Sequence, residues 1–475
     1  MPRIWASGSS SPVCDQKKRH ANPRARRSSI KPAASAMRIT PRRMIRRISL
    51  RPPIVKGRRG QRSSSADIPR CPGLRRVVTD RHQREMYPMV SGHYRCAGII
   101  RLRTACFPKD TRMDYAARRA KLAQSVQNAD AIALVPGANL KYFTGLNLHT
   151  SERPIIALVQ GEQLSLIIPA LEVPQVHARP DLEAQLFAWT DTEGYQGAFE
   201  AAVRTLGLAD ATIAVDDQSM RLFEWMGFEA VSSTIRRHPV GADLLLLRQQ
   251  KDAGELAAMR EACKRSESAF DALLAWVKPG MTERQIGLKL DSLLIEHGCH
   301  GLSFESLVQT GPNSARPHGG VTDRALQTGE FLLVDWGGRY NGYPADLTRT
   351  VVFGTPSAEM QKIHDTVVAA NRAGVAACKP GVRCGDVDKA ARDVIEAAGY
   401  GEYFIHRTGH GLGLEVHELP QIASGVDAPL KVGSVFTVEP GIYVPGLGGV
   451  RIEDNVVITE TGAEQLSSFR RQVAP

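Results

Sequence analysis

The sequence lacks several patterns that would assign it to a familiar class. No stretch reaches the roughly 18 consecutive apolar residues that a membrane-spanning helix needs, so no membrane span is expected. There is no G-x-S-x-G elbow, no H-E-x-x-H helix and no Walker or Rossmann glycine loop, which disfavours a serine hydrolase, a single-zinc protease and a nucleotide-binding domain. None of the eight cysteines forms a C-x-x-C pair, so we expect no zinc–thiolate site and a reduced, cytoplasmic protein.

Acidic residues are almost missing from the first 112 positions. This segment holds 28 Lys and Arg residues against 5 Asp and Glu residues, a net charge of +23. Residues 113–475 hold 33 basic and 44 acidic residues, so they carry −11, and the overall charge of +12 hides this division. An acidic body gives no electrostatic reason to bind nucleic acid, and no such partner is expected for it.

Residues 1–112 are rich in Arg, Ser and Pro and show no sustained apolar period. Such a segment cannot bury enough surface to offset the entropy lost on ordering, so we predict a disordered or non-native extension. Three interpretations stay open: a solvated tail, an organelle-targeting segment, or upstream sequence that is not translated, with Met113 as the true start. We prefer the last, because the folded pattern begins abruptly at Met113.

The remaining sequence divides into two predicted domains. Residues 113–247 combine helical spacing with short β-rich runs bounded by Gly, Pro and Asp, which predicts a smaller α/β domain. Residues 248–475 open with a long helical pattern and continue with a second helix, which Thr282 caps while Gln285 reaches back. Strands, two further helices and more strands follow.

The second domain contains a weak internal repeat. Residues 277–298 align without gaps on residues 378–399, an offset of 101 positions, and both segments carry Lys-Pro-Gly near the start and glycine at the end. Two similar helix starts could match by chance. The alternative is a duplicated αβ unit with pseudo-two-fold symmetry, which predicts a site that draws its ligands from both halves.

Five side chains in this domain are candidate metal ligands. Asp335 ends the apolar run LLVD, and Asp346 follows eleven residues later, so two strands joined by a turn could place these carboxylates side by side. Alone, such a pair is a weak signal. His410 lies in a glycine-rich loop, Glu439 follows VFTV, and Glu453 is placed inside the apolar strand VRIEDNVVI.

Buried carboxylates in this number need positive charge to balance them. Four hard oxygen ligands and one imidazole suit Mn, Co, Fe or Zn, and two ions rather than one. Carboxylates can bridge ions about 3.5–4 Å apart, and a water held between them becomes hydroxide near neutral pH. The donor set therefore predicts a two-metal hydrolytic site.

Four motifs occur in a fixed order in this domain: DWGGRYNGYPADLTRT, GHGLGLEVHE, VEPG and GGVRIED. Together they resemble the metallopeptidases of the pita-bread (creatinase/aminopeptidase) fold, which include methionine aminopeptidases, Xaa-Pro aminopeptidases and prolidases. The upstream run YFTGLNLHTSERP resembles the N-terminal domain of the proline-specific members. The resemblance implies a creatinase-like N-terminal α/β domain at 113–247 and a pita-bread catalytic domain at 248–475, and it does not cover residues 1–112.

The resemblance also implies a role for each matched residue. Asp335 would bind one metal through both oxygens, Asp346 and Glu453 would bridge the two ions, and His410 and Glu439 would complete the second. Glu439 would also act as the general base on the bridging water. Since all five positions match, nothing suggests a metal-free relative.

Four further residues match positions that serve catalysis in this family. Any lone histidine is more often structural, but with the motifs matched around them His318, His406 and His417 would contact the substrate and stabilise the tetrahedral intermediate. Arg451, two residues before Glu453, would support the site. Tyr343 also falls in a family-typical position, but it is given no role.

The resemblance implies metal-dependent hydrolysis of the bond between an N-terminal residue and proline, because methionine aminopeptidases lack the extra α/β domain. Dipeptidase and aminopeptidase action are harder to separate. Gln421 stands where some prolidases carry an arginine for the substrate carboxylate, which slightly favours an aminopeptidase, although an arginine elsewhere could serve. Two alternatives remain: a creatinase-like, metal-independent amidinohydrolase, and a non-catalytic binding protein on the same fold.

The expected cofactors are two divalent ions, with Mn²⁺ preferred over Co²⁺, Zn²⁺ and Fe²⁺. The expected partners are peptides with proline at the second position. The family resemblance also implies a homodimer, which the sequence itself does not show.

Overall fold

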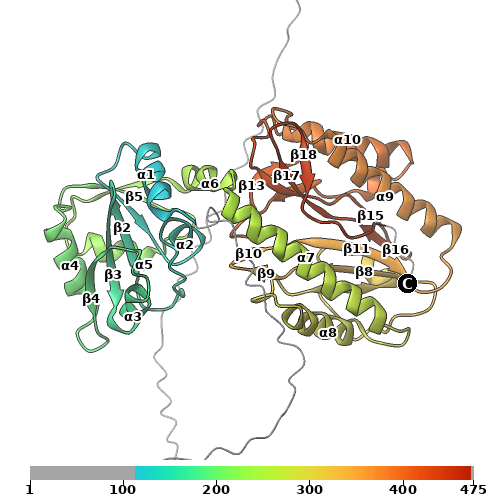
Figure 1. Ribbon diagram of the computed structural model, residues 1–475, viewed down its shortest axis with the longest axis horizontal. Helices are drawn as coiled ribbons and strands as arrows, with labels where there is room; N and C mark the ends of the chain where they lie inside the picture. The colour runs from blue at the N-terminus through green and yellow to red at the C-terminus, as the bar shows by residue number, and fades with distance from the viewer. Residues whose placement is uncertain (1–112, 472–475) are drawn as a thin grey trace, which may run out of the picture. The chain divides into compact units, whose positions relative to one another are not determined.

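The computed structural model describes residues 113–471 (Figure 1). The predicted extension at 1–112 lies outside the described residues, so its order stays a prediction. No helix within the described part of the chain combines the length and the apolar character needed to cross a bilayer. The four cysteines found there, at positions 263, 299, 378 and 384, are buried and unpaired.

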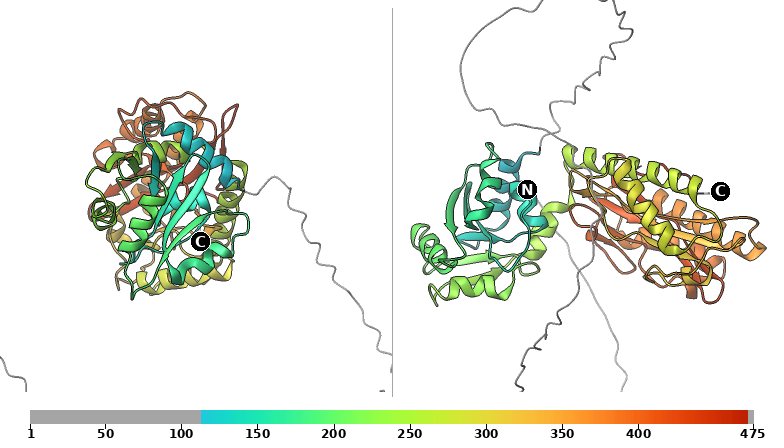
Figure 2. Two further views of the ribbon diagram at one scale, coloured as in Figure 1. Left: turned by 90° about the vertical axis from the view of Figure 1, so that its left-hand side faces the viewer. Right: turned by 90° about the horizontal axis from the view of Figure 1, so that it is seen from below.

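The first part of the described chain is a six-stranded mixed sheet with helices on both faces (Figures 1 and 2). The strand order is β4-β3-β2-β1-β5-β6, with parallel pairs at both edges and antiparallel pairs in the centre. The strands are β1 (Ala131–Leu134), β2 (Ile156–Gln160), β3 (Gln163–Pro169), β4 (Gln185–Trp189), β5 (Thr212–Val215) and β6 (Arg236–Pro239).

Alternating side chains of these strands build two separate cores, because successive residues of a strand point to opposite faces. Ile132 and Leu134 pack on the side of α1 (Tyr115–Ser125) and α2 (Ala138–Thr144). Ala131 and Ala133 pack with Phe199 and Phe228 on the other side. Short helices complete this part: α3 (Val173–His177), α4 (Gln196–Thr205), α5 (Leu222–Glu229) and α6 (Gly241–Gln249).

The second part is built from two helix pairs, two larger antiparallel sheets and two short two-stranded ribbons. The helices are α7 (Ala253–Trp276), α8 (Glu283–Glu296), α9 (Ala358–Ala377) and α10 (Cys384–Ala397). One sheet has the order β11-β8-β7, from β7 (Leu307–Thr310), β8 (Phe331–Trp336) and β11 (Leu347–Val352). The other has the order β13-β12-β14-β17-β18, from β12 (Gly409–Gly411), β13 (Glu418–Ile422), β14 (Val435–Val438), β17 (Asp454–Ile458) and β18 (Ala463–Gln465).

These elements confirm the duplicated unit. Helices α8 and α10 each have 14 residues and begin 101 positions apart, and the helices before them, α7 and α9, end 101 positions apart. In both halves three of the strands that follow the helices pair antiparallel in the same order, β7-β8-β11 and β12-β14-β17. Two similar helix starts by chance would not reproduce the strand order as well, so the pseudo-two-fold αβ repeat and the pita-bread fold are confirmed.

The helix starts also follow the sequence signals. Thr282 accepts a hydrogen bond from the Gln285 backbone N–H at 3.2 Å, and the Gln285 side chain accepts one from the Thr282 N–H at 2.9 Å. This is the capping box that the sequence predicts, and it satisfies two otherwise orphaned donors at the start of α8.

One strand assignment is wrong. Glu453 does not lie inside a continuous strand VRIEDNVVI, because the chain leaves β16 (Gly448–Arg451), which pairs with β15 (Gly441–Val444), and enters β17, which pairs with β14. Glu453 sits in the break and forms an isolated antiparallel bridge with Thr348. The apolar pattern could not reveal this change of partner, since side chains on both sides of the break are buried.

The glycines at the ends of α8 and α10 allow a test of the left-handed backbone conformation there. Gly298 and Gly399 close the two equivalent helices with φ of +85° and +87°, a region that L-residues enter at a cost of about 1–2 kcal/mol. A Cβ on Gly399 would meet nothing within 4 Å, so strain alone acts there. We expect Gly399→Ala to lower the free energy of unfolding by about 1 kcal/mol, measured by urea denaturation of the metal-free protein.

Gly197 is the matched control, because it lies in α4, shows no positive φ, and a Cβ there also meets nothing within 4 Å. Gly197→Ala is expected to be neutral or stabilising by up to about 1 kcal/mol. A Gly399→Ala protein as stable as the wild type would show that α10 does not end in the left-handed conformation.

Candidate functional site

One cavity of about 540 Å³ collects all nine candidate metal-ligating and catalytic residues that the sequence indicated. Its lining also includes Arg407 and apolar side chains from several loops and from β7 (Leu307–Thr310). The volume falls in the range typical of pockets for small ligands, about 300–1,000 Å³. The predicted residues in the lining are Asp335, Asp346, His410, Glu439, Glu453, His318, His406, His417 and Arg451.

The first half of the repeat supplies two aspartates. Strands β8 and β11 pair antiparallel, with Asp335 opposite Thr348 and Trp336 opposite Leu347, so Asp346 stands at the entry to β11 beside the end of β8. The short hairpin of β9 (Arg339–Tyr340) and β10 (Tyr343–Pro344) makes the turn between them. The strand pairing therefore brings the two aspartates to the same end of the sheet, and both line the cavity.

The second half supplies His410 from β12 and Glu439 from the residue after β14. The Nε2 atom of His410 lies 3.3 Å from Glu439 Oε1 and 3.6 Å from Asp346 Oδ2. The other ring nitrogen, Nδ1, lies 3.2 Å from the Gly411 carbonyl oxygen. As the donor to that carbonyl, Nδ1 carries the proton, which leaves Nε2 with a free lone pair directed at the carboxylates.

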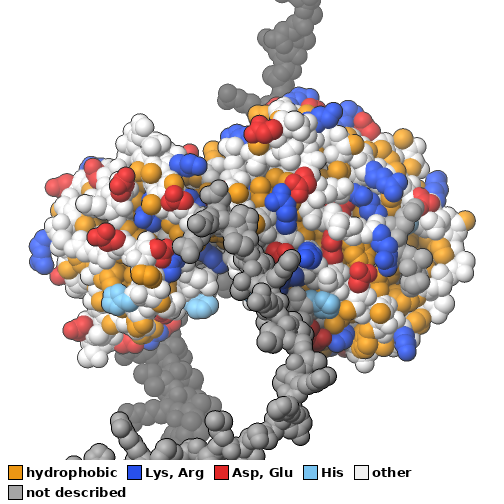
Figure 3. Space-filling model, viewed as in Figure 1, with side chains coloured by type: hydrophobic (Ala, Val, Ile, Leu, Met, Phe, Trp, Pro, Cys, Tyr) orange, Lys and Arg blue, Asp and Glu red, His pale blue; other side chains and the backbone are white. Residues whose placement is uncertain are grey.

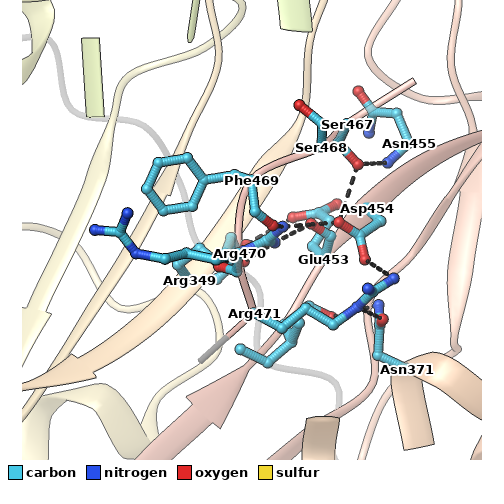
Figure 4. Close-up of polar contacts among 12 residues, drawn as sticks. Arg349, Asn371, Glu453, Asp454, Asn455, Ser467, Ser468, Phe469, Arg470 and Arg471 are labelled. Atoms are coloured by element: carbon cyan, nitrogen blue, oxygen red, sulfur yellow. Dashed lines mark hydrogen bonds and ion pairs between the residues drawn. The ribbon is translucent and has the colours of Figure 1, made fainter. Parts of the chain in front are cut away.

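Glu453 joins the two halves. Its backbone N–H donates to the Thr348 carbonyl at 3.1 Å, and its Oε2 accepts a hydrogen bond of 2.6 Å from the Thr348 hydroxyl. Behind this crossing, the Arg349 guanidinium donates to the carbonyls of Thr348 and Glu453 and pairs with buried Asp454 at 2.8 Å (Figure 4). The buried Arg349 guanidinium therefore fixes the backbone conformation at Glu453.

Negative charge is concentrated in this cavity. Burial raises the pKa of Asp346 and of Glu453 well above the usual range, and the neighbouring carboxylates raise both further. Burial also raises the pKa of Asp335, and that of Glu439 to about 7, although Arg451 opposes both shifts. Since burial lowers the pKa of His410 to about 3, that imidazole is neutral at pH 7 and brings no positive charge.

Arg451 ties several of these groups together. Its Nη2 donates to Asp335 Oδ2 at 2.6 Å, its Nε to the Thr348 hydroxyl at 3.0 Å, and its Nη1 to the Tyr443 hydroxyl at 2.9 Å. The same hydroxyl lies 2.9 Å from His406 Nε2. Tyr443 thus links Arg451 to His406, a role that the sequence did not indicate, because a tyrosine in an apolar strand carries no distinctive signal.

The donor set fits a divalent metal. One atom each from Asp346, His410 and Glu453 lies within 4.8 Å of the others, close enough to share one ion. Asp335 stands outside this trio, but its Oδ1 is buried and has no hydrogen-bond partner within residues 113–471. A buried carboxylate oxygen without a partner is costly, and a bound cation would satisfy it.

The three additional histidines surround this cluster in different environments. His318 and His417 are exposed at the cavity, and the His417 ring centre lies 4.2 Å from that of His410. His406 is more enclosed, and burial lowers its pKa to about 4. All three line the cavity, and the contact with substrate that the family resemblance implies for them stays a prediction.

Two buried acidic residues that the sequence reading missed hold the loops of the site. Glu283, at the start of α8, accepts hydrogen bonds from Thr310, Asn313 and Thr322, which flank the segment that carries His318. Asp388, on α10, accepts from the backbone and hydroxyl of Thr408 at 3.0 and 2.8 Å. Only the fold brings these acceptors to their loops, so spacing alone could not find them.

Asp388 also binds Arg392, which in turn donates to the carbonyls of Phe404 and His406 at 3.1 and 3.0 Å. The pair therefore holds the segment from Phe404 to Thr408 from both ends. This segment carries His406 and Arg407 into the cavity.

The cavity thus combines clustered carboxylates, an imidazole with a free nitrogen and an unsatisfied buried oxygen, which is the arrangement of a metal-dependent hydrolase. Comparison with known proteins agrees with this class. The description "Metallopeptidase family M24" matches residues 257–460, and "Creatinase/Prolidase N-terminal domain" matches residues 118–250. An uncharacterized peptidase of Staphylococcus saprophyticus is 38% identical over 349 residues, which are 73% of this chain and 97% of the relative.

Solved structures give the same result. A prolidase of Thermococcus sibiricus superposes with a TM-score of 0.72 at 33% identity, covering 76% of this chain and 99% of that one. An X-Pro aminopeptidase of Thermotoga maritima gives 0.68 at 31% identity, again covering 76% and 99%. The chain is a member of metallopeptidase family M24, with the creatinase/prolidase type of N-terminal domain.

The contribution of Asp388 to the stability of the fold can be tested by substitution. Asp388→Ala removes the acceptor of buried hydrogen bonds and the partner of Arg392, so we expect a loss of about 1.5–3 kcal/mol in the free energy of unfolding. Asp393→Ala, on the same helix, removes only an exposed i,i+4 pair with Lys389 and should cost no more than about 0.5 kcal/mol. Equal losses in urea denaturation would contradict the assigned role of Asp388.

Proposed function

We propose that this chain hydrolyses the peptide bond between an N-terminal residue and proline, with the help of two divalent metal ions. The observation that carries the proposal is the convergence of five side chains, from five separate strands or strand ends, on one cavity. Family membership supports peptide hydrolysis, and the named relatives, a prolidase and an X-Pro aminopeptidase, support the preference for proline.

In this proposal Asp346 and Glu453 would be shared by both ions, His410 and Glu439 would complete one of them, and Asp335 would hold the other. Binding of Asp335 through both oxygens differs from its present contacts, because Oδ1 has no hydrogen-bond partner among the described residues while Oδ2 accepts from Arg451. The mixed oxygen and imidazole donors suit Mn²⁺, which we prefer, and also Co²⁺, Zn²⁺ or Fe²⁺. Bound there, the ions supply a water of lowered pKa as the nucleophile.

The protein groups then have separate tasks. Glu439 takes the proton of the attacking water, and its pKa near 7 in the metal-free cavity shows how strongly its surroundings favour proton uptake. His318 and His417 face the substrate and donate hydrogen bonds to the oxyanion that develops on the scissile carbonyl. His406 has no free N–H for this task, because its Nδ1 binds the Arg407 carbonyl and its Nε2 the Tyr443 hydroxyl, so it supports the site through these contacts. Arg451 keeps Asp335 and Tyr443 in position.

The shape of the cavity is compatible with a proline-containing peptide. Apolar side chains line it alongside the charged groups, namely Phe304, Leu307, Val321 and Val416. A pyrrolidine ring can bury its methylene groups against such a wall, and each buried methylene contributes about 0.8 kcal/mol.

The two alternatives fit less well. A creatinase-like, metal-independent enzyme would have no use for four carboxylates around an unprotonated imidazole. A non-catalytic binding protein for nucleic acid would need a basic face, whereas the face in Figure 3 shows Lys and Arg interspersed with Asp and Glu. The homodimer that the family resemblance implies stays a prediction, as does the domain boundary between residues 247 and 248.

Removal of one bridging ligand tests the metal site. We expect the purified wild-type protein to bind two Mn²⁺ per chain and to release alanine from Ala-Pro, and a chelator to abolish this activity reversibly. Asp346→Ala should bind at most one ion and lose more than the roughly 10–100-fold in turnover that is typical of substitutions outside the metal shell.

Asp365→Ala, at an exposed aspartate of α9, is the matched control and should behave as the wild type. Metal content is measured by elemental analysis and turnover by release of free proline. Full activity of Asp346→Ala, or of the chelated wild type, would contradict the metal mechanism.

Metal affinity should depend on pH. Because the pKa of Glu439 is raised to about 7, this ligand is largely protonated below pH 7 in the metal-free protein, and a proton must leave before the metal binds. Release of this one proton alone weakens the apparent affinity by about tenfold between pH 8 and pH 6, and the raised pKa values of Asp346 and Glu453 act in the same direction, so tenfold is the smallest change expected. Calorimetric titration of the metal-free protein with Mn²⁺ at both pH values checks this, and a pH-independent affinity would contradict it.

A further inference from the structure

Two arginines line the cavity, Arg407 and Arg451, and only Arg451 has been given a role so far. Arg407 lines the cavity together with the candidate metal ligands and is half-buried there. Among residues 113–471, its guanidinium makes no hydrogen bond or ion pair. The other arginine of the lining, Arg451, is fully engaged with Asp335, Tyr443 and Thr348.

Arg407 is held in place by its backbone rather than by its side chain. Asp388 binds the backbone N–H of the next residue, Thr408, and Arg392 binds the carbonyl of the residue before it, His406. The His406 ring lies 2.7 Å from the Arg407 carbonyl oxygen through Nδ1. The main chain is therefore fixed on both sides while the guanidinium stays available, which is how a preorganised binding group is built.

The guanidinium is close enough to the site to act on it electrostatically. Burial lowers the pKa of His417, and the positive charge of Arg407 is the next contribution. Arg407 contributes in the same direction to His410 and Glu439. The only other exposed charged residue of the lining is Glu305, and no ion pair joins it to Arg407 within the described chain.

We propose that Arg407 binds the free terminal carboxylate of a short substrate, so that the site selects Xaa-Pro dipeptides over longer peptides. The planar guanidinium can meet a carboxylate with two parallel hydrogen bonds. In a dipeptide this carboxylate belongs to the proline itself, one residue from the scissile bond. An additional residue moves it by about 3.3–3.6 Å and places an uncharged amide there instead. The inference rests on the proposed Xaa-Pro hydrolysis.

The assignment of Arg407 also explains how the substrate carboxylate can be bound although residue 421 is a glutamine. Gln421 lies on β13, is exposed, and does not line the cavity, so it cannot supply the cation. Arg407 enters the same cavity from a different part of the chain, fourteen positions earlier. The carboxylate can therefore be recognised without an arginine at the position that some prolidases use.

The test compares three substrates that differ only beyond the proline: Ala-Pro, Ala-Pro-amide and Ala-Pro-Ala. With the full chain loaded with Mn²⁺, we expect kcat/KM for Ala-Pro to exceed that for the amide by about 10- to 100-fold, the range for loss of one charged hydrogen-bond pair. Arg407→Gln should reduce this ratio towards one, mainly by a rise in KM for Ala-Pro, and leave turnover of the amide nearly unchanged. Arg407→Lys, which keeps the charge but loses the bidentate geometry, should give an intermediate ratio.

Arg372→Gln is the matched control, because Arg372 is an exposed arginine of α9 that does not line the cavity. It should retain the wild-type ratio. Thermal unfolding of each variant checks that the fold is retained, and if Arg407→Gln unfolds, the comparison rests on Arg407→Lys.

Two results would overturn the inference and leave the proposed function intact. In the first, wild type cleaves the acid, the amide and the tripeptide equally well. In the second, Arg407→Gln lowers turnover of acid and amide by the same factor, which would give Arg407 a role at the reacting atoms instead. Failure of the wild-type, metal-loaded protein to cleave any of the three substrates would instead contradict the proposed Xaa-Pro hydrolysis.

Discussion

The constraint on which the structure depends is the burial of four carboxylates in one cavity with too little positive charge to balance them. Burial alone raises the pKa of each one, and Arg451 offsets only part of the imbalance. Isolated buried charges of this kind are strongly unfavourable unless they are paired or bound to metal. Without a cation, the cavity can relieve the repulsion only by taking up protons. The site is therefore built for divalent ions, and much of the surrounding hydrogen bonding keeps its ligands in place.

The duplicated unit explains how such a cluster can be assembled. Each half provides two helices and three antiparallel strands, and the ligands sit near the ends of strands that meet where the halves join. Asp335 and Asp346 come from the first half, and His410, Glu439 and Glu453 from the second. The crossing of Thr348 and Glu453, with Arg349 behind it, fixes the two halves against each other at this point. Rigid strands are suited to this task because a metal site tolerates little movement of its ligands.

The loops around the cluster differ from the strands in what they contribute. Glu283 and Asp388 are buried acceptors, one in each half, that hold loops bearing residues which face the substrate. The same loop carries His406, which is linked to Arg451 through Tyr443, and Arg407, whose guanidinium has no protein partner in the described chain. The candidate metal ligands thus lie on strands or strand ends, while the candidate substrate-binding side chains lie on loops. The related structures include both a prolidase and an X-Pro aminopeptidase, so one fold supports more than one specificity.

The sequence by itself determined the family, the two-part division of the chain, the long helices of the second part, the capping of α8 and the candidate ligand and catalytic residues, because local spacing and motif chemistry carry that information. It also indicated the repeat, through an offset of 101 positions that reappears in the helices. Only the tertiary structure decided that Glu453 stands in a break between two strands, that Tyr443 links Arg451 to His406, and that Asp388 holds the loop of Arg407. Each of these depends on contacts between residues far apart in the chain or on a change of strand partner. A pattern of apolar and polar residues is the same whichever neighbour a strand pairs with, so such decisions are made only when the chain packs.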